Sequence, residues 1–372
     1  GHQSGVTESE SEDTSEASTD TVEAQEPEIQ LEHPGVVTVQ FSPTDSATLL
    51  SAGRGGLRVW KIVTTEEVTQ VFACQGCFSG AEFSPDGQLI ATSSGETGAS
   101  VWMASSGEKL RSLDGADSVE FVQWSSCGQL ILAGGSAGEA WLWPHSLSAK
   151  PKAARGHTAP VVCGAFAPDA TAVATAAGRE VRVWKAEDMT RQRTFENLHS
   201  AAIVGIAWHP KQPLLVTSSE DATVQVVNPS TGERIRELWG NSEAVDTVSF
   251  SARGAEALLA TAGHDGLLQV WDCSSWHALA HLEDSSGHGI LDGKWLGEDG
   301  QIFAVVSTDG SAAVWDVRTS QRTHLLAGGS EAATAVSVVE LSQRGQPGWH
   351  MGRIATASAD DTIRIYRCVL HD

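Results

Sequence analysis

The chain has 372 residues, 41% of them hydrophobic, and 24 Lys and Arg face 47 Asp and Glu, for a formal net charge of -23. This charge balance disfavours binding to a nucleic-acid backbone and favours a cationic partner. No apolar run reaches the roughly 18 residues of a membrane span, and the N-terminus is acidic rather than basic and apolar. We therefore expect a cytoplasmic protein without a membrane partner, whose six scattered cysteines are free thiols.

The first 33 residues hold ten acidic side chains and no Lys or Arg. Low hydrophobicity and charge of one sign predict that residues 1–26 form a disordered acidic tail and that residues 27–372 form the folded domain. Within the folded part, EIQLEH (Glu28 to His33) has the alternation of a short strand ahead of the first regular unit.

The rest of the chain repeats one pattern eight times, with three β-rich runs in each unit. The units end at Trp60, Trp102, Trp143, Trp184, Val227, Trp271, Trp315 and Tyr366, at steps of 42, 41, 41, 43, 44, 44 and 51 residues. A period in the low forties with a terminal W or WD resembles the WD40 repeat. The resemblance implies an all-β WD40 β-propeller of eight four-stranded blades. Seven blades plus an irregular segment is the alternative.

The segments between the units predict how the ring closes. EKLRSL (108–113) and ERIREL (233–238) are typical of a fourth, outer strand of the preceding blade, but the last unit stops six residues after Tyr366 and has no such segment. We therefore predict that Glu28 to His33 supplies the missing edge strand. The last unit is also longer, and an insertion at Gln343 to Gly352 predicts a hairpin loop between its first two strands.

The resemblance also implies a structural role for recurring polar residues. In WD repeats a turn Asp accepts hydrogen bonds from backbone and from a His, which meets a Ser or Thr, which meets the Trp. Acids stand six residues before four unit ends: Asp221, Asp265, Asp309 and Asp360. The seventh unit alone holds all four members, His288, Ser307, Asp309 and Trp315, which predicts a buried structural tetrad there. A Ser-His-Asp catalytic triad is the alternative for the same residues. The first four units lack the acid, so we expect packing to hold them.

Other motifs suggest no chemistry. CQGC (Cys74 to Cys77) has no second pair at a zinc-site spacing, and GGSAG (Gly134 to Gly138) lies at a turn between two strands rather than at a strand-to-helix elbow. No glycine-rich loop opens onto a helix. We therefore predict no metal site, no cofactor and no catalytic residues.

Acidic side chains recur where the propeller geometry predicts one face, the top. It is formed by the residues that lead into each first strand and by the turns that hold the Asp residues. The predicted partner-binding residues are Glu120, Asp246, Glu220, His264, Asp117, Glu243 and Asp284; the neighbouring loops add Asp114, Glu196, Glu283 and Glu331. Acids gathered at one opening would steer a basic peptide, whereas ordinary solvation of surface loops is the simpler explanation.

Several stretches resemble the angio-associated migratory cell protein family. The third unit, SVEFVQWSSCGQLILAGGSAGEAWLW, is similar to that family's third blade, and VTSSEDATVQVVNPSTGERI is similar to its fifth; VDTVSF and CSSW resemble its sixth. An acidic tail before eight units also fits. Fungal members are dedicated chaperones that hold the basic N-terminal segment of a large-subunit ribosomal protein on an acidic top face. The family's acids map onto Glu120 and Asp246.

The sequence therefore predicts a non-enzymatic, monomeric protein-binding module. The resemblance implies a chaperone for the basic N-terminal segment of a large-subunit ribosomal protein during ribosome biogenesis, with no direct contact to nucleic acid. The alternative is a general WD40 scaffold or adaptor in signalling or in a ubiquitin-ligase complex.

Overall fold

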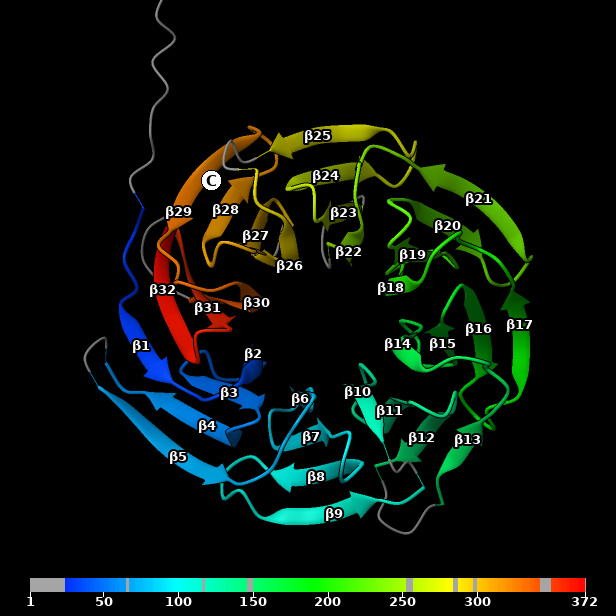
Figure 1. The fold of residues 1–372 in the computed structure, drawn as a ribbon, viewed down its shortest axis with the longest axis horizontal. Coiled ribbons are helices and arrows are strands. Elements are labelled where there is room, and N and C mark those ends of the chain that lie inside the picture. The colour runs from blue at the N-terminus through cyan, green and yellow to red at the C-terminus, as the bar shows by residue number, and fades with distance from the viewer. Residues whose placement is uncertain are drawn as a thin grey trace, which may run out of the picture.

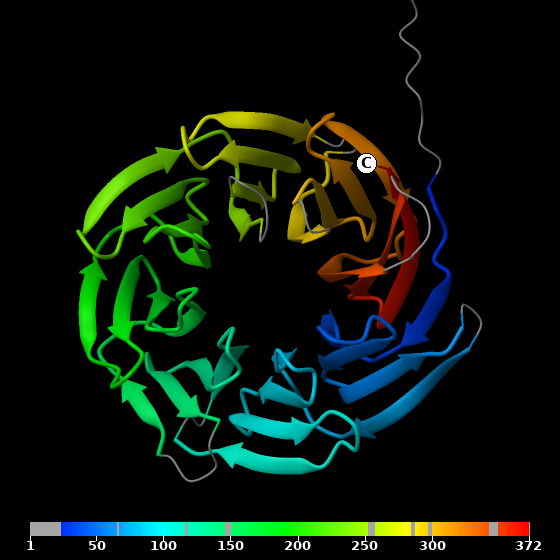
Figure 2. The ribbon, with the colours of Figure 1, turned by 180° about the vertical axis from the view of Figure 1, so that it is seen from behind.

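The described residues form one closed ring of β-sheets. The computed structural model describes residues 24–64, 67–115, 118–145, 150–251, 257–283, 287–296, 300–341 and 349–371. Within these ranges, eight antiparallel four-stranded sheets stand as blades around a central opening (Figure 1), and the view from behind shows the same ring (Figure 2). The prediction of an all-β, eight-bladed propeller is confirmed, and the seven-bladed alternative is wrong. The described part contains no helix long and apolar enough to cross a membrane.

Blades 1 to 4 each use four consecutive strands, from the inner edge to the outer edge. Blade 1 consists of β2 (Val36–Phe41), β3 (Thr48–Gly53), β4 (Gly56–Ile62) and β5 (Val68–Cys74). Blade 2 consists of β6 (Gly80–Phe83), β7 (Leu89–Ser93), β8 (Ala99–Met103) and β9 (Lys109–Leu113). Blade 3 consists of β10 (Val119–Trp124), β11 (Leu130–Gly135), β12 (Ala140–Pro144) and β13 (Lys152–Ala154). Blade 4 consists of β14 (Val161–Phe166), β15 (Ala172–Ala177), β16 (Glu180–Lys185) and β17 (Arg191–Phe195).

Blades 5 to 7 follow the same order, and blade 8 completes the ring with a strand from the N-terminus. Blade 5 consists of β18 (Ile203–Trp208), β19 (Leu215–Ser219), β20 (Val224–Asn228) and β21 (Glu233–Leu238). Blade 6 consists of β22 (Val245–Phe250), β23 (Leu258–Gly263), β24 (Leu267–Asp272) and β25 (Ala278–Glu283). Blade 7 consists of β26 (Ile290–Leu296), β27 (Ile302–Ser307), β28 (Ala312–Asp316) and β29 (Gln321–Leu326). Blade 8 consists of β30 (Ala333–Leu341), β31 (Trp349–Ser358), β32 (Thr362–His371) and β1 (Ile29–Glu32).

The core lies between neighbouring blades rather than within any one of them. Leu296 and Val314 of blade 7 pack with Ile354 and Tyr366 of blade 8, for example. A middle strand has a neighbouring blade on each face, so β27 is buried along its whole length and carries almost only apolar residues. The outer strand β21 is exposed at all positions but its last, which explains its charged sequence. Each blade therefore depends on its two neighbours for its core.

Strand β1 closes the ring by pairing antiparallel with β32, with Ile29 opposite Ile365 and Leu31 opposite Ile363. Ile29 is buried and belongs to the cluster that joins blade 8 to blade 1. Closure by a strand from Glu28 to His33 is thus confirmed. The longer last unit has the extended strands β30 and β31, which pair as far as Leu341 and Met351. Of the hairpin loop predicted at Gln343 to Gly352, residues 343–348 lie outside the described residues and residues 349–352 belong to β31.

The folded part begins slightly before the predicted boundary at residue 27. Gln25 lies against β29, where its N–H donates to the Leu325 carbonyl at 2.7 Å and its carbonyl accepts from the Ala327 N–H at 2.8 Å. Its side-chain amide also donates to the Arg367 carbonyl at 2.9 Å. Residue 25 is thus bound to blades 7 and 8. The rest of the predicted tail, residues 1–23, lies outside the described residues.

The closure can be tested with two truncated chains. A chain that starts at residue 24 should melt at the same temperature as the full chain. A chain that starts at residue 34 loses β1, exposes the edge of β32 and removes the buried Ile29, so it should lose about 3 kcal/mol or more of stability and associate through the open edge. Thermal unfolding with light scattering compares the two, and equal melting temperatures would contradict closure by β1.

Candidate protein-binding face

A recurring β-bulge forms the rim of the central opening. Seven first strands carry a register irregularity around their second residue. In β2, β10, β14, β18 and β22 this residue is also the fourth before the aromatic residue that ends the strand. The residues at this position are Val37, Glu120, Val162, Val204, Asp246, Leu291 and Thr334. A bulge inserts an extra residue and re-aims its side chain. We call these seven residues the bulge ring and the side of the ring that carries it the top face.

The bulge ring mixes acidic and apolar side chains. Glu120 is exposed and lines the central cavity, and Asp246 is half-buried with 22% of its side chain accessible. Val37 and Val162 are 40% and 45% exposed, although both are large apolar residues. The two acids were predicted to lie on the top face, but the exposed valines were not. A peptide on this rim would meet both kinds of side chain.

Around Asp246 the structure brings three of the predicted residues together. Its Oδ2 lies 3.0 Å from Nε2 of His264, which stands in the turn between β23 and β24. Burial raises the pKa of the Asp246 carboxyl, the negative charge of Glu220 raises it further, and His264 opposes the rise. Glu220 is exposed and comes from the corresponding turn of blade 5. A cation that binds here would relieve the repulsion between the two carboxylates.

The remaining predicted acids are less closely grouped. Glu243 is exposed in the loop before β22, while Asp117 and Asp284 lie outside the described residues. Arg54 and Arg179 occupy, in blades 1 and 4, the turns equivalent to those that carry Glu220 and His264. Negative charge on the top face is therefore not uniform, and Glu220, Asp246 and Glu243 gather on blades 5 and 6.

The polar networks that hold the top-face turns differ from the predicted one. In blade 1, Ser51 Oγ accepts from the Trp60 indole N–H at 2.8 Å and meets His33 Nδ1 at 2.7 Å. Burial lowers the pKa of His33 to about 4, so the ring is neutral and its Nε2 can donate to the Gly56 carbonyl at 3.1 Å. A His-Ser-Trp relay thus exists in a blade that we expected to be held by packing.

Blade 4 holds a four-membered network with a different acid. Thr175 Oγ1 lies 2.8 Å from both His157 Nε2 and the Trp184 indole nitrogen, and His157 Nδ1 lies 2.6 Å from Glu180 Oε1. Glu180 is the first residue of β16 and takes the place of the turn Asp. The sequence pattern missed it because we sought the acid only at six residues before the Trp.

The predicted tetrad of blade 7 is not formed, and the prediction of a buried His288 is wrong. His288 is 47% exposed, and its Nδ1 lies 3.3 Å from Asp309 Oδ2. Among the described residues, neither His288 nor Trp315 forms a hydrogen bond with the Ser307 hydroxyl. The pairing of β27 with β28 explains why: Phe303 faces Trp315 and Val305 follows two residues later, whereas in blade 1 Leu49 faces Trp60 and Ser51 follows. Val305 therefore occupies the hydroxyl position, and Ser307 lies beyond it.

Asp309 has a local role in this turn. Its Oδ1 accepts from the backbone N–H of Ser311 at 2.9 Å and from the Ser311 hydroxyl at 2.6 Å. This is the hydrogen bonding by which Asp stabilises a turn. Since Ser307 and His288 do not meet, the geometry of a Ser-His-Asp triad is absent from these residues.

Side chains of the first strands join neighbouring blades across the channel wall. Gln40, Glu82 and Gln123 stand directly before the aromatic residues of β2, β6 and β10. Each accepts the backbone N–H of the aromatic residue in the next blade: Phe83 at 2.7 Å, Trp124 at 2.7 Å and Phe166 at 3.3 Å. We call these contacts clasps. Asp292 and Ser337 make similar bonds to Val336 and Phe41, at 3.1 Å and 2.9 Å.

Glu82 is the only carboxylate among the first three clasps, and its environment is unfavourable to charge. Burial in the channel wall raises the pKa of the Glu82 carboxyl to about 7, against the hydrogen bond from Trp124 and the charge of Lys294, which both lower it. Near neutral pH this clasp is therefore partly protonated.

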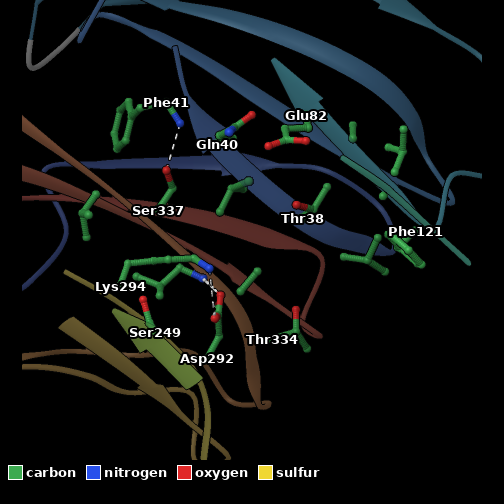
Figure 3. Close-up of a pocket in the computed structure, with 18 of the residues that line it drawn as sticks. Thr38, Gln40, Phe41, Glu82, Phe121, Ser249, Asp292, Lys294, Thr334 and Ser337 are labelled. Carbon is green, nitrogen blue, oxygen red and sulfur yellow. Dashed lines mark hydrogen bonds and ion pairs between the residues drawn. The ribbon is translucent and has the colours of Figure 1, made fainter. Parts of the chain in front are cut away.

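Behind the bulge ring lies a cavity of about 790 Å³ in the central channel, lined by the first strands of blades 1, 2, 3, 6, 7 and 8. Figure 3 shows Gln40 and Glu82 on one side of it and Asp292 and Lys294 on another. Lys294 Nζ lies 3.6 Å from Asp292 Oδ1. The described residues contain no group of three or more His, Cys, Asp or Glu that could hold a metal ion. This arrangement can bind charged side chains.

The fold and the repeats together define the class of the protein. The family described as "WD domain, G-beta repeat" matches residues 150–185, 189–228 and 232–272. The C-terminal WD40 domain of Sif2 superposes with a TM-score of 0.77 at 18% identity, over 94% of this chain and 99% of that domain. Sqt1 of Saccharomyces cerevisiae superposes with a TM-score of 0.80 at 10% identity, over 93% of this chain and 99% of that one. The chain therefore has the fold of an eight-bladed β-propeller and carries WD40 repeats within residues 150–272, and WD40 propellers generally serve as protein-interaction modules.

The chain is also similar to angio-associated migratory cell protein, whose family the third, fifth and sixth units resemble. It is 23% identical to the protein of Canis lupus familiaris over 303 residues, which are 77% of this chain and 68% of the relative. The chain is also 29% identical over 221 residues to telomerase protein component 1 of Rattus norvegicus. This match covers 54% of this chain but only 8% of that protein.

The blade 4 network can be tested against blade 7 with two hydroxyl deletions. Thr175→Val leaves His157 Nε2 and the Trp184 N–H without partners in a buried site. It should therefore lower the free energy of unfolding by about 1 to 3 kcal/mol. Ser307→Ala removes a hydroxyl outside any relay and should cost less than about 1 kcal/mol. Urea unfolding of both variants gives the comparison. Similar losses would contradict the assignment of Val305 to the hydroxyl position.

The raised pKa of Glu82 predicts that its ionisation lowers the free energy of unfolding as pH increases. An acid whose pKa rises from 4.5 in the unfolded chain to about 7 in the folded one destabilises the fold progressively as pH increases between these values. Glu82→Gln keeps the acceptor, as Gln40 and Gln123 show, and should resemble the parent near pH 4.5. Near pH 8 it should be more stable than the parent by about 1 to 3 kcal/mol. Denaturant unfolding at both pH values measures this, and a stability difference independent of pH would contradict it.

Proposed function

We propose that this WD40 propeller binds the basic, extended N-terminal segment of a large-subunit ribosomal protein on its top face and shields it before ribosome assembly. The observation that carries the proposal is the bulge ring, which places Glu120 and Asp246 on the rim of the central opening. The net charge of -23 would attract a Lys- and Arg-rich segment. The similarity to angio-associated migratory cell protein supports this choice of client.

The proposed mechanism is charge pairing followed by mass action. A client segment whose Lys and Arg side chains are paired with Glu120, Glu220 and Asp246 is kept from RNA and from aggregation while it is bound. No covalent step is involved, and the proposal assigns no catalytic residue. It describes a cytoplasmic monomer that contacts neither nucleic acid nor membrane.

A general scaffold or adaptor is the second candidate, and the exposed Val37 and Val162 favour it. A partner held by these valines would bind through apolar contacts near the same opening. The two candidates differ in their response to salt, because pairing of exposed charges weakens steeply with ionic strength and apolar burial does not.

The proposal can be tested by titrating a Lys- and Arg-rich N-terminal peptide of a large-subunit ribosomal protein into the full chain. Each charge-assisted contact is worth about 1.5 to 3 kcal/mol, so Glu120→Gln and Asp246→Asn should each weaken binding at least about tenfold. Binding by the parent should weaken as salt increases. Isothermal titration calorimetry at two salt concentrations measures both effects.

The matched control is Glu108→Gln, which removes one exposed charge from the turn between β8 and β9, away from the bulge ring. It should bind as the parent does. Unchanged affinity in both top-face variants, or affinity that is indifferent to salt, would instead support the scaffold.

A further inference from the structure

The clasp position in the channel wall requires a hydrogen-bond acceptor but not a charge. Gln40 and Gln123 fill it in the blades on either side of blade 2 and bind the next strand with a neutral amide. Glu82 makes the same bond to the Trp124 N–H with a carboxylate, at a position where burial opposes ionisation. The clasp therefore does not explain why blade 2 has an acid here.

Only one oxygen of the Glu82 carboxylate accepts a hydrogen bond from the described residues. Its Oε2 accepts from Trp124, while its Oε1 accepts no hydrogen bond from the residues that the structure describes. The side chain lines the 790 Å³ cavity together with Glu120, Asp292 and Lys294. Lys294 shows that this cavity accommodates an ammonium group, since its Nζ lies 3.6 Å from Asp292 Oδ1. Figure 3 shows Glu82 and this ion pair on different sides of the same space.

The cavity connects with the top face. Its lining includes Val37, Glu120 and Thr334 from the bulge ring, and Ser79 leads into the strand that carries Glu82. Three residues along a strand correspond to about 10 Å, so Glu82 lies about that far below the rim. From the top face, a long side chain on a segment that enters the opening can reach it.

We propose that the cavity receives one Lys or Arg side chain of the bound peptide and that Glu82 pairs with its cation. This inference rests on the proposed binding of a basic segment at the top face, and it adds the residue that selects a long cationic side chain at one position of that segment. Glu82 thus has two roles, with Oε2 holding blade 3 and Oε1 facing the ligand.

Pairing with a cation favours the ionised form of Glu82, so binding should release protons near neutral pH. The charged groups that share the cavity with Glu82 are Lys294 and Asp292 from β26 and Glu120 from β10; the polar Gln40 comes from β2. His264 pairs with Asp246 in blade 6 and is not among the residues that line the cavity. A pH response that depends on Glu82 can therefore be separated from one that depends on His264.

The first experiment titrates the full-length parent, Glu82→Gln and the control Glu108→Gln with the peptide acetyl-Gly-Arg-Gly-Arg-Gly-amide at pH 6 and pH 8. The parent and the control should bind about fivefold more tightly at pH 8, as expected for a group with a pKa near 7. Glu82→Gln should bind more weakly at pH 8 and lose most of this pH dependence. If it binds as the parent does at both pH values while Glu120→Gln and Asp246→Asn weaken binding, the cavity site is wrong and the top-face proposal stands.

The second experiment needs neither a variant nor the proposed client. The carboxyl carbon of Glu82 is titrated by carbon-13 NMR in the full-length parent, with and without saturating N-acetyl-arginine methylamide. The probe should lower the pKa of Glu82 and leave that of Glu108 unchanged. An unchanged Glu82 pKa would overturn the cavity site, whatever the outcome of the top-face titrations.

Discussion

The pairing of β1 with β32 is the contact on which the rest of the propeller depends. Every blade buries its core against two neighbours, so an open ring would leave apolar faces of blades 8 and 1 in water. Residues 29–32 and residues 362–365 are joined across almost the whole chain by four strand-paired positions. This pairing completes blade 8, which packs on blade 1, and so supports the arrangement of eight first strands around one opening.

The fold was largely predictable because it follows from local repetition. Three features of the sequence together determine the number of blades and the closure. They are the unit ends at steps near 42 residues, the outer-strand segments between them and the additional strand at Glu28 to His33. The hydroxyl relays were not predictable in the same way. Val305 and Ser307 lie two residues apart on the same face of β27, and the register of β27 against β28 decides which of them stands at the hydroxyl position beside Trp315.

The candidate site was predicted in part for the same reason. Glu120 and Asp246 each stand four residues before an aromatic residue, and both were expected at the top opening, whereas the bulge that carries them was not predicted. Glu180 and Glu82 could not be found that way, since their roles come from neighbours 23 and 42 residues away that the fold brings into contact. Val37 and Val162 have the same spacing to an aromatic residue, but a valine in a strand usually indicates burial, so their exposure was not predicted.

The two acids of the channel wall illustrate how one fold position can serve structure and binding together. Asp292 and Glu82 each give an oxygen to a backbone N–H of the next blade, so neither can rotate away without breaking a contact between blades. An acid fixed by the fold in this way is pre-organised, so a cation that binds it causes little further loss of side-chain conformational entropy. Asp292 already has Lys294 as its cation, whereas Glu82 has no such partner within 4 Å in the described part of the chain. The asymmetry between two otherwise similar acids is what marks blade 2 as the side of the channel open to a ligand.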